Sequence, residues 1–290
     1  MKTAELTMLN SMADADLEVA LAKHKEWGIR HLDIRDGIAG KWVKDITVGE
    51  AREAKRAIDD AGMDVFCLST SIFYGDVTDG EASFHENQVG ALDHILEIAE
   101  VLQPKLVRII AAQLPGRAPD ESAVEILQRD YPWLIDQYRE VVDKIAAAGF
   151  TATIENEANK SFLSRTQDFV DFHEWLDRPE VSLTWDINNQ WATGVFPTQE
   201  DYEQLKPLIR YYHLKGGQHA DADKNLKWNS SLEDSTYDVV GITTRVVQDG
   251  VSPIICLNPS QHGENKPGYD YTNLVKRDID FLRANVEGIL

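Results

Sequence analysis

Four side chains that can bind a metal ion stand at the ends of short apolar runs in the second half of the chain: Glu155, Asp186, His213 and Asn258. Each follows β-branched, aliphatic or aromatic residues, which are typical of buried strands. Two carboxylates, one imidazole and one amide suit Mn²⁺, Mg²⁺, Co²⁺ or Zn²⁺ better than a thiophilic metal. The pattern therefore predicts a site for one divalent ion, with Mn²⁺ as the first choice.

Eight short apolar runs alternate with segments of helical periodicity along the whole chain. We expect strands near Glu5–Leu9, His31–Arg35, Val65–Thr70, Leu106–Ala111, Ala152–Asn156, Ser182–Ile187, Tyr211–Leu214 and Ile254–Leu257. Nearly continuous apolar runs are typical of parallel strands that are covered on both faces. No change of composition divides the chain. The pattern therefore predicts an α/β fold, with residues 1–290 forming a single (β/α)8 TIM barrel.

The runner-up fold is a doubly wound open sheet. The chain has no Gly-x-Gly-x-x-Gly after its first expected strand, and Gly216-Gly217 is too short to serve alone as a phosphate-binding loop. In a barrel, by contrast, the carboxyl ends of all strands converge on one mouth. The barrel would therefore bring the four candidate ligands together.

The composition narrows the classes of partner. The chain has 29 basic and 49 acidic residues, a net charge of −20, which disfavours nucleic acid and anionic membranes as partners. The start Met1–Glu5 lacks an apolar signal core, and no apolar run approaches the length of a membrane span, so we expect a cytoplasmic protein. Cys67 and Cys256 lie inside expected strands without a Cys-x-x-Cys pattern, so both are expected to be reduced core thiols.

Three short segments resemble a known family. Ile154-Glu155-Asn156, Trp185-Asp186 and His213-Leu214-Lys215 resemble the xylose isomerase-like superfamily of sugar and sugar-phosphate isomerases and epimerases. The nearest analogy is to the ketose epimerases of the tagatose/psicose type, in which a Glu, an Asp, a His and a second Glu at these strand ends bind one divalent ion. The resemblance implies that Glu155, Asp186 and His213 are metal ligands and that Asn258 occupies the position of the second Glu.

The resemblance also implies a reaction, the isomerisation or epimerisation of a sugar or polyol derivative. The ion would acidify a C–H bond between a carbonyl and a hydroxyl group and stabilise the resulting enediolate. Glu155 is the candidate proton-moving group, and Glu157 and Lys215 are the other expected catalytic residues. Asn258 can bind a metal through its carbonyl oxygen, but an amide does not shuttle protons. A second acid would then come from elsewhere, or the reaction would not need one.

Substrate contacts are expected from Arg108, Asn189, His219 and His262. Asn189 stands where many relatives have a His, and His219 stands where the ketose epimerases have a substrate-binding Arg. His262, or Glu264 beside it, lies in the polar loop after the last expected strand and could replace the missing acid.

Two further groups of residues could line the mouth of the barrel. Asp33 and Arg35 lie on the second expected strand and are the first group. Aromatic residues in or near loops could either face a sugar ring or pack against neighbouring elements. They are Trp42, Phe73, Trp191 and Trp228.

Three alternatives remain open at the level of sequence. Lyases and dehydratases of the same superfamily need one base and a leaving-group acid, which the Asn258 substitution accommodates. A sugar- or metal-binding barrel without catalysis is the non-enzyme alternative. The apurinic endonuclease branch uses many more His ligands than this chain offers, and the charge of −20 opposes DNA binding. The sequence leaves homo-oligomer formation open.

Overall fold

Eight parallel strands form the central sheet of the computed structural model, which describes residues 2–118, 120–228, 231–259 and 271–290. The strands are β1 (Glu5–Thr7), β2 (His31–Ile34), β5 (Asp64–Ser69), β6 (Leu106–Ile110), β7 (Thr151–Glu155), β8 (Ser182–Asp186), β9 (Ile209–Leu214) and β12 (Ile254–Leu257). Their order in the sheet is β1-β12-β9-β8-β7-β6-β5-β2. A parallel bridge joins Leu9 to Asp33, and the Thr7 hydroxyl donates to the His31 carbonyl oxygen at 2.5 Å, so the two edge strands meet. The expected TIM barrel is therefore confirmed.

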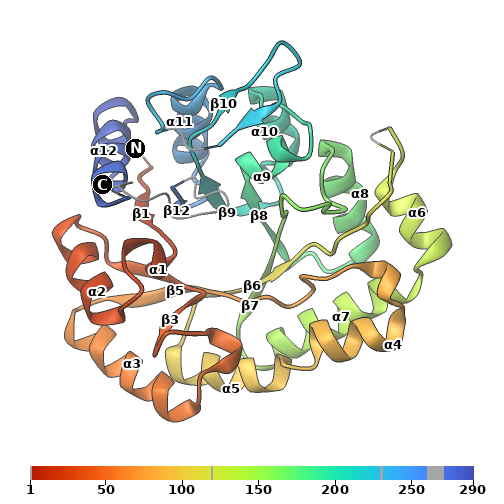
Figure 1. The fold of residues 1–290 in the computed structure, drawn as a ribbon, viewed down its shortest axis with the longest axis horizontal. Helices are drawn as coiled ribbons and strands as arrows, with labels where there is room; N and C mark the ends of the chain where they lie inside the picture. The colour runs from red at the N-terminus through yellow and green to blue at the C-terminus, as the bar shows by residue number, and fades with distance from the viewer. Residues whose placement is uncertain (1, 119, 229–230, 260–270) are drawn as a thin grey trace.

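Helices form a layer around the strands (Figure 1). The longer ones are α2 (Leu17–Glu26), α3 (Val48–Asp60), α5 (Leu92–Leu102), α6 (Ala123–Asp130), α7 (Trp133–Ala147), α8 (Thr166–Leu176), α10 (Gln199–Leu205), α11 (Val239–Asp249) and α12 (Tyr271–Asn285). Shorter helices lie in the connections: α1 (Asn10–Ala13), α4 (Glu81–Phe84) and α9 (Ile187–Ala192). Two hairpins also occur there, β3 (Asp36–Ile38) with β4 (Lys41–Trp42) and β10 (Gln218–His219) with β11 (Leu226–Lys227).

All eight expected strands are present, but several end earlier than the apolar pattern predicts. β8 is one example: Ile187 extends its apolar run, yet the strand ends at Asp186. The carboxylate of Asp186 accepts the backbone N–H of Asn188, so Asp186 caps α9 and Ile187 becomes its first residue. The helix therefore begins at the barrel mouth, directly after a candidate ligand. The sequence pattern did not reveal the two hairpins.

Helix α3 shows how local sequence signals fix the outer layer. The Thr47 hydroxyl accepts the Glu50 N–H at 3.2 Å, and the Glu50 carboxylate accepts the Thr47 N–H at 2.7 Å. This is the expected capping box, which satisfies donors that a helix start leaves free. Behind it, Ala51, Ala54 and Ile58 are buried on one face. The cap and the apolar stripe therefore define both the start of the helix and its orientation.

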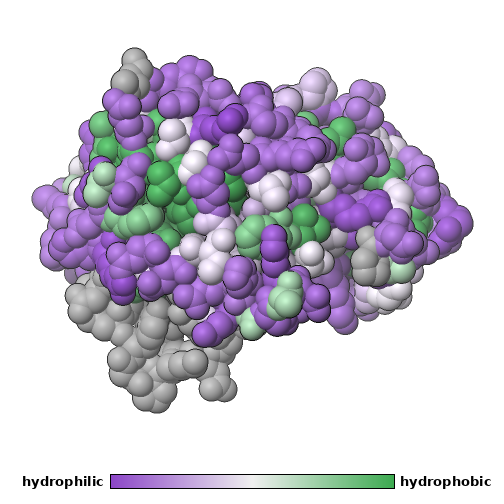
Figure 2. All heavy atoms as spheres, turned by 90° about the horizontal axis from the view of Figure 1, so that it is seen from above, coloured by the Kyte–Doolittle hydropathy of each residue, from purple (hydrophilic) through white to green (hydrophobic). Residues whose placement is uncertain are grey.

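The two ends of the described chain lie side by side (Figure 1). The Ala4 N–H donates to the Gly288 carbonyl oxygen at 2.9 Å, and the Leu290 N–H donates to the Ala4 carbonyl oxygen at 3.0 Å. Cys67 and Cys256 are buried free thiols inside the barrel. Hydrophilic residues cover most of the face seen in Figure 2, with apolar residues visible between them in separate groups. No helix in the described ranges combines the length and apolar character that crossing a bilayer requires.

A buried acid on α12 gives a testable pH dependence. Asp278 is 1% exposed and accepts the Leu232 N–H at 2.8 Å, and burial raises the pKa of its carboxyl group to about 7. Because its folded-state pKa lies above its unfolded value, its contribution to stability is present at low pH and is lost as the pH rises towards 7. Between pH 5.5 and pH 8 the wild type should therefore lose about 2 kcal/mol of unfolding free energy relative to Asp278→Asn.

Urea unfolding at the two pH values measures this difference. Asp280→Asn, which changes an exposed acid on the same helix, is the matched control and should follow the wild type at both pH values. Equal pH dependence in Asp278→Asn and the wild type would contradict the assignment.

Candidate active site

Three of the four candidate ligands meet at the mouth of the barrel. Glu155, Asp186 and His213 lie at or near the ends of β7, β8 and β9, and each is 2% exposed or less. His213 Nδ1 is 3.0 Å from Glu155 Oε1 and 3.8 Å from Asp186 Oδ2. One ligand atom from each residue lies within 4.8 Å of the other two. Asp186 and His213 pair in the register of neighbouring parallel strands, and this places their side chains together.

Hydrogen bonds fix one carboxylate oxygen and the backbone of Asp186, and its other oxygen, Oδ2, faces the site. Its Oδ1 accepts the N–H groups of Asn188 at 3.1 Å and Asn189 at 2.9 Å. Its backbone N–H donates to Asn156 Oδ1 at 2.8 Å, and Asn156 Nδ2 donates to its carbonyl oxygen at the same distance. Within the described ranges its Oδ2 accepts no hydrogen bond of ordinary geometry, but it lies 2.6 Å from Lys215 Nζ. This oxygen therefore faces a cation.

Lys215 and Asn189 form one unit with Asp186. Lys215 Nζ donates to Asn189 Oδ1 at 3.0 Å, and Asn189 Nδ2 donates to the Asn156 carbonyl oxygen at 3.0 Å. Burial acts to lower the pKa of Lys215, but the charges of Asp186, Glu157 and Glu155 outweigh it and raise that pKa. Lys215 is therefore an ammonium group at the edge of the cluster.

Arg108, on β6, forms an ion pair with Glu155 and donates to the Thr70 carbonyl oxygen at 2.8 Å. Both partners of the pair are buried. Burial acts to raise the pKa of Glu155, but the charges of Arg108 and His213 hold it well below its usual range. Glu155 is therefore an anion, as a metal ligand must be.

Glu157 lies two residues beyond Glu155, and its pKa is shifted in the opposite direction. Burial, reinforced by the nearby charge of Glu155, raises the pKa of Glu157. Its Oε2 accepts the Ala158 N–H at 3.0 Å. The site thus contains two neighbouring carboxyl groups whose environments shift their pKa values in opposite directions.

Asn258 also reaches the cluster, directly after β12. Its Nδ2 is 3.3 Å from His213 Nδ1. Its Oδ1 accepts the Leu9 N–H at 3.4 Å and the Cys256 thiol at 3.2 Å. The amide is therefore part of the site, with its oxygen turned away from His213.

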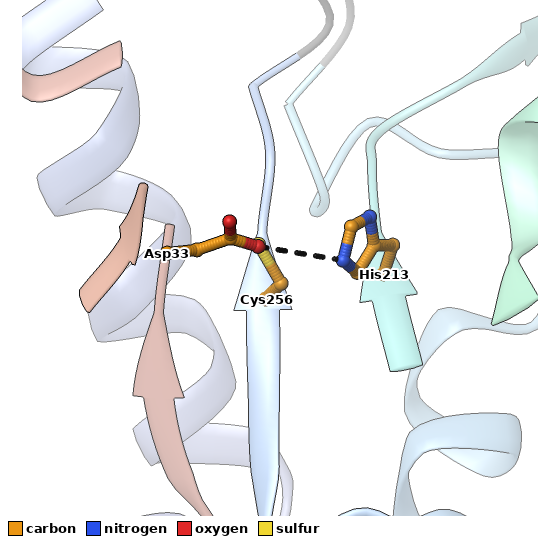
Figure 3. A group of neighbouring side chains, drawn as sticks. All are labelled: Asp33, His213 and Cys256. Atoms are coloured by element: carbon orange, nitrogen blue, oxygen red, sulfur yellow. Dashed lines mark hydrogen bonds and ion pairs between the residues drawn. The ribbon is translucent and has the colours of Figure 1, made fainter. Parts of the chain in front are cut away.

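Asp33, near the end of β2, is fully buried and faces His213 (Figure 3). Its Oδ2 is 3.8 Å from His213 Nε2 and accepts the Tyr211 hydroxyl at 2.7 Å, while its Oδ1 accepts the Ser69 hydroxyl at 2.5 Å. Cys256 Sγ is 3.8 Å from the same Oδ2. Burial raises the pKa of Asp33, although the charge of His213 partly opposes this. Among the described residues, His213 Nε2 has no hydrogen-bond partner.

A cavity of about 410 Å³ opens beside this cluster. Its walls include Arg35, Trp42, Lys44, Tyr74, Arg108 and Glu157. Arg108 and Glu157 border both the cavity and the charged cluster. The cavity is therefore the space through which a small molecule would approach the carboxylates.

The four aromatic residues noted in the sequence have different surroundings. Phe73 is buried and stacks on Tyr138 with 3.8 Å between ring centroids, and Trp191 is buried and donates to the Lys224 carbonyl oxygen at 2.6 Å. Packing is therefore the correct interpretation for these two. The Trp228 ring centroid is 6.0 Å from Lys215 Nζ. Trp42 is exposed and lines the cavity.

Of the two histidines expected to contact substrate, only His219 lies within the described residues, and no described contact joins it to the cluster. His219 lies on the exposed β10–β11 hairpin, where its ring is 6.4 Å from the Phe196 ring, and its backbone N–H donates to the Thr236 hydroxyl at 2.9 Å. Its contact with substrate stays a prediction. His262 and Glu264 lie outside the described residues.

Sequence comparison gives the family. A family model described as the xylose isomerase-like TIM barrel matches residues 21–284. The chain belongs to the xylose isomerase-like TIM barrel family. The resemblance seen in the strand-end motifs is therefore confirmed. No curated protein matches the sequence.

Solved structures share the fold of this chain over almost its whole length. D-psicose 3-epimerase with D-tagatose from Clostridium cellulolyticum H10 has a TM-score of 0.72 at 13% identity, covering 99% of this chain and 100% of that one. The probable 3-DHS dehydratase of petrobactin synthesis from Bacillus anthracis has a TM-score of 0.70 at 12% identity, covering 98% and 99%. A xylose isomerase-like protein from Mycobacterium smegmatis, in complex with magnesium, has a TM-score of 0.68 at 16% identity, covering 97% and 95%. At these identities the likeness concerns the fold.

Proposed function

We propose that this protein is an enzyme that moves a proton on a sugar or sugar derivative with the help of one divalent metal ion, as an isomerase or epimerase. The observation that supports this most directly is the buried meeting of Glu155, Asp186 and His213 within 4.8 Å. Membership of the xylose isomerase-like family agrees with it. Structural neighbours include a protein described as a D-psicose 3-epimerase.

The residues present fit a divalent ion. Glu155, Asp186 and His213 supply two carboxylate oxygens and a ring nitrogen, a donor set typical of Mn²⁺, Mg²⁺, Co²⁺ or Zn²⁺. Asp186 Oδ2 is buried and faces the cation Lys215, so the protein already places positive charge there. Half a turn of the Asn258 amide would turn its oxygen towards His213 and add a fourth ligand. Mn²⁺ is our first choice, and a neighbouring structure is a magnesium complex.

When bound, such an ion would polarise adjacent carbonyl and hydroxyl oxygens of the sugar and so acidify the C–H bond between them. Glu155, kept anionic by Arg108, would accept that proton. Glu157, whose pKa is raised, would hold and return a proton from the side of the cavity. Lys215 would stabilise the negative charge that develops on a substrate oxygen.

The positions of the expected substrate-binding residues suggest how each would act. Arg108 would meet the substrate at the cavity wall. Asn189 would act through Lys215, because its side-chain oxygen and nitrogen are both engaged in hydrogen bonds. His219 and His262 are proposed as further contacts from the loops above the barrel.

A lyase or dehydratase is the second candidate. Asn258 stands where the ketose epimerases have a second Glu, so the site lacks a matching base at that position. Glu155 and Glu157 instead have pKa values shifted in opposite directions. Such an asymmetric pair suits an elimination, in which one group removes a proton and the other protonates the leaving hydroxyl. The neighbour from Bacillus anthracis is described as a probable dehydratase.

Proton exchange tests the proposal and separates these reactions. The protein would be stripped with EDTA, reloaded with Mn²⁺, Mg²⁺, Co²⁺ or Zn²⁺, and incubated in D₂O with a panel of ketoses, aldoses and keto-sugars. We expect metal-dependent deuterium incorporation into recovered sugar. A dehydrated product that absorbs in the ultraviolet would identify a lyase instead. Exchange that survives both EDTA and Glu155→Gln would contradict the proposal, and tight sugar binding without turnover would favour a non-catalytic barrel.

Asp33 should set the metal affinity through His213. If His213 binds the ion through Nδ1, its Nε2–H points to the Asp33 carboxylate, and a small side-chain shift would close the 3.8 Å gap. Carboxylates that hold a ligating histidine in this way typically contribute about 10–100-fold to metal affinity. We therefore expect Asp33→Asn to weaken Mn²⁺ binding, measured by calorimetry, by about that factor. Asp64→Asn, which changes an exposed acid on β5, is the control and should bind Mn²⁺ normally.

A further inference from the structure

The cavity of about 410 Å³ extends beyond the place where the reacting carbons would lie. On one side it is bordered by Arg108 and Glu157, which also belong to the charged cluster. On the other side its wall is formed by Trp42 on β4 and Tyr74 in the connection after β5. A single hexose occupies on the order of 200 Å³, judged from the roughly 30 Å³ taken by one water molecule. The cavity therefore leaves room for a second group joined to the reacting sugar.

The far wall presents aromatic side chains to solvent. In the described part of the chain, the large hydrophobic residues classed as exposed include two aromatics, Trp42 at 44% and Tyr74 at 43%. Both line this one cavity. Phe73, the neighbour of Tyr74, is by contrast fully buried. Exposed aromatic rings gathered at one cavity are a feature of small-molecule sites, where their flat faces pack against a ring of the ligand.

The Arg35 side chain packs against one face of the Trp42 ring. The Arg35 guanidinium lies 5.0 Å from the centroid of the Trp42 ring, within the range of a cation–π contact. Arg35 is in turn held by Asp36, whose Oδ2 is 3.1 Å from its terminal nitrogen. The β3–β4 hairpin thus keeps an exposed indole in a defined orientation, which limits the entropy lost when a ligand ring binds.

The charges of the cavity favour a neutral occupant. Two of its cations already have carboxylate partners, because Arg35 pairs with Asp36 and Arg108 pairs with Glu155. Lys44 and Asp45, which carry opposite charges, both line the cavity. A site for a phosphate group would offer unpaired cations or a cluster of backbone N–H donors. This wall offers aromatic faces.

We propose that the substrate is a two-ring compound, a glycoside whose reacting sugar lies at the carboxylate cluster and whose second ring, a neutral sugar or aryl group, packs between Trp42 and Tyr74. This inference rests on the proposed function for the position of the reacting sugar. It adds that a free monosaccharide or a sugar phosphate fills the site incompletely.

Binding of matched pairs of compounds tests the proposal. Calorimetry on the Mn²⁺-loaded and the EDTA-treated protein would compare 4-nitrophenyl glycosides and disaccharides of the gluco, galacto, xylo and fructo series with the corresponding free sugars and sugar phosphates. We expect at least one two-ring compound to bind about 10-fold or more tightly than its free sugar, in line with one aromatic ring contact. If no two-ring compound binds better than its free sugar, or if a sugar phosphate binds best, the proposal is overturned.

Single substitutions test whether Trp42 and Tyr74 bind the second ring. Trp42→Ala should remove the advantage of the two-ring compound and leave free-sugar binding within about 2-fold, whereas Trp42→Phe should keep most of it because an aromatic face remains. Tyr74→Ala is a second, independent test, and Val19→Ala, equally exposed on α2, is the control. An advantage that persists in both Trp42→Ala and Tyr74→Ala overturns the proposal.

The two proposals fail in different ways. Two-ring binding that depends on Trp42 but is accompanied by no metal-dependent proton exchange would overturn the proposed function and support this cavity assignment. Metal-dependent exchange that is as fast on free monosaccharides as on two-ring compounds, with two-ring binding unchanged in Trp42→Ala, would support the function and overturn the assignment.

Discussion

Glu155→Gln should lower the rate of metal-dependent proton exchange on the sugar substrate by about 10³-fold or more, because general acid–base groups contribute roughly 10²–10⁴-fold and the same side chain is a proposed metal ligand. The amide keeps the size of the carboxylate but removes both its charge and its basicity. Exchange into the recovered sugar in D₂O, followed by NMR, measures the loss. The measurement is made at saturating Mn²⁺, so that a weaker metal affinity of the variant does not contribute to the loss of rate.

Two further substitutions make this result interpretable. Glu97→Gln changes an exposed carboxylate on α5 and should leave exchange unchanged. Glu157→Gln should reduce exchange less than Glu155→Gln, and it should alter the pH profile if Glu157 returns the proton. If Glu155→Gln retained wild-type exchange at saturating Mn²⁺, the role assigned to Glu155 would be wrong.

Arg108→Met should lower the free energy of unfolding by about 3–5 kcal/mol, the usual cost of removing one partner of a buried ion pair. Arg108 and Glu155 are both buried, and the ion pair helps to hold the pKa of Glu155 well below its usual range. Without Arg108, Glu155 must either stay charged in a buried site or take up a proton. Denaturant unfolding at neutral pH measures the effect, which should diminish as the pH falls and Glu155 becomes protonated in the variant.

A double variant and a surface control test the reason for this loss. Arg108→Met combined with Glu155→Gln should be more stable than Arg108→Met alone, because it also removes the uncompensated charge. Arg129→Met, which changes an arginine in an exposed ion pair with Asp130, should change stability by less than about 1 kcal/mol. Equal losses at both arginines would contradict the role of the buried pair.

Arg108 and Lys215 place positive charge beside the carboxylates of the site. Each cation lies beside a candidate ligand, Glu155 in one case and Asp186 in the other. Burial acts to raise the pKa of Glu155, but the charges of Arg108 and His213 hold it well below its usual range, and Lys215 places a positive charge beside Asp186. A metal ion could use these anions only if they stay charged, so the two cations prepare the site for the proposed chemistry.

The number of strands, their assembly into a barrel and the positions of three candidate ligands could be predicted from the sequence alone. The alternation of apolar runs and helical stripes predicted eight parallel strands in a barrel, since strands covered on both faces must be apolar along their length. The same pattern placed Glu155, Asp186 and His213 at strand ends, and parallel strands in a barrel bring such ends to one mouth. Even the start of α3 could be predicted, because a capping box is a contact between residues three apart.

The partners of these residues were decided only by the tertiary structure. Asp33 meets His213 and Tyr211 through contacts between residues far apart in the sequence. The register of β2 against β5 also shifts between Leu32 and Asp33, an irregularity that alternation along a strand cannot reveal. Trp42 on the β3–β4 hairpin and Tyr74 after β5 line the same cavity, a position set by contacts between residues far apart in the sequence. Local patterns record which face of an element is buried, whereas the choice between partners depends on register, curvature and loop path, which only the folded chain defines.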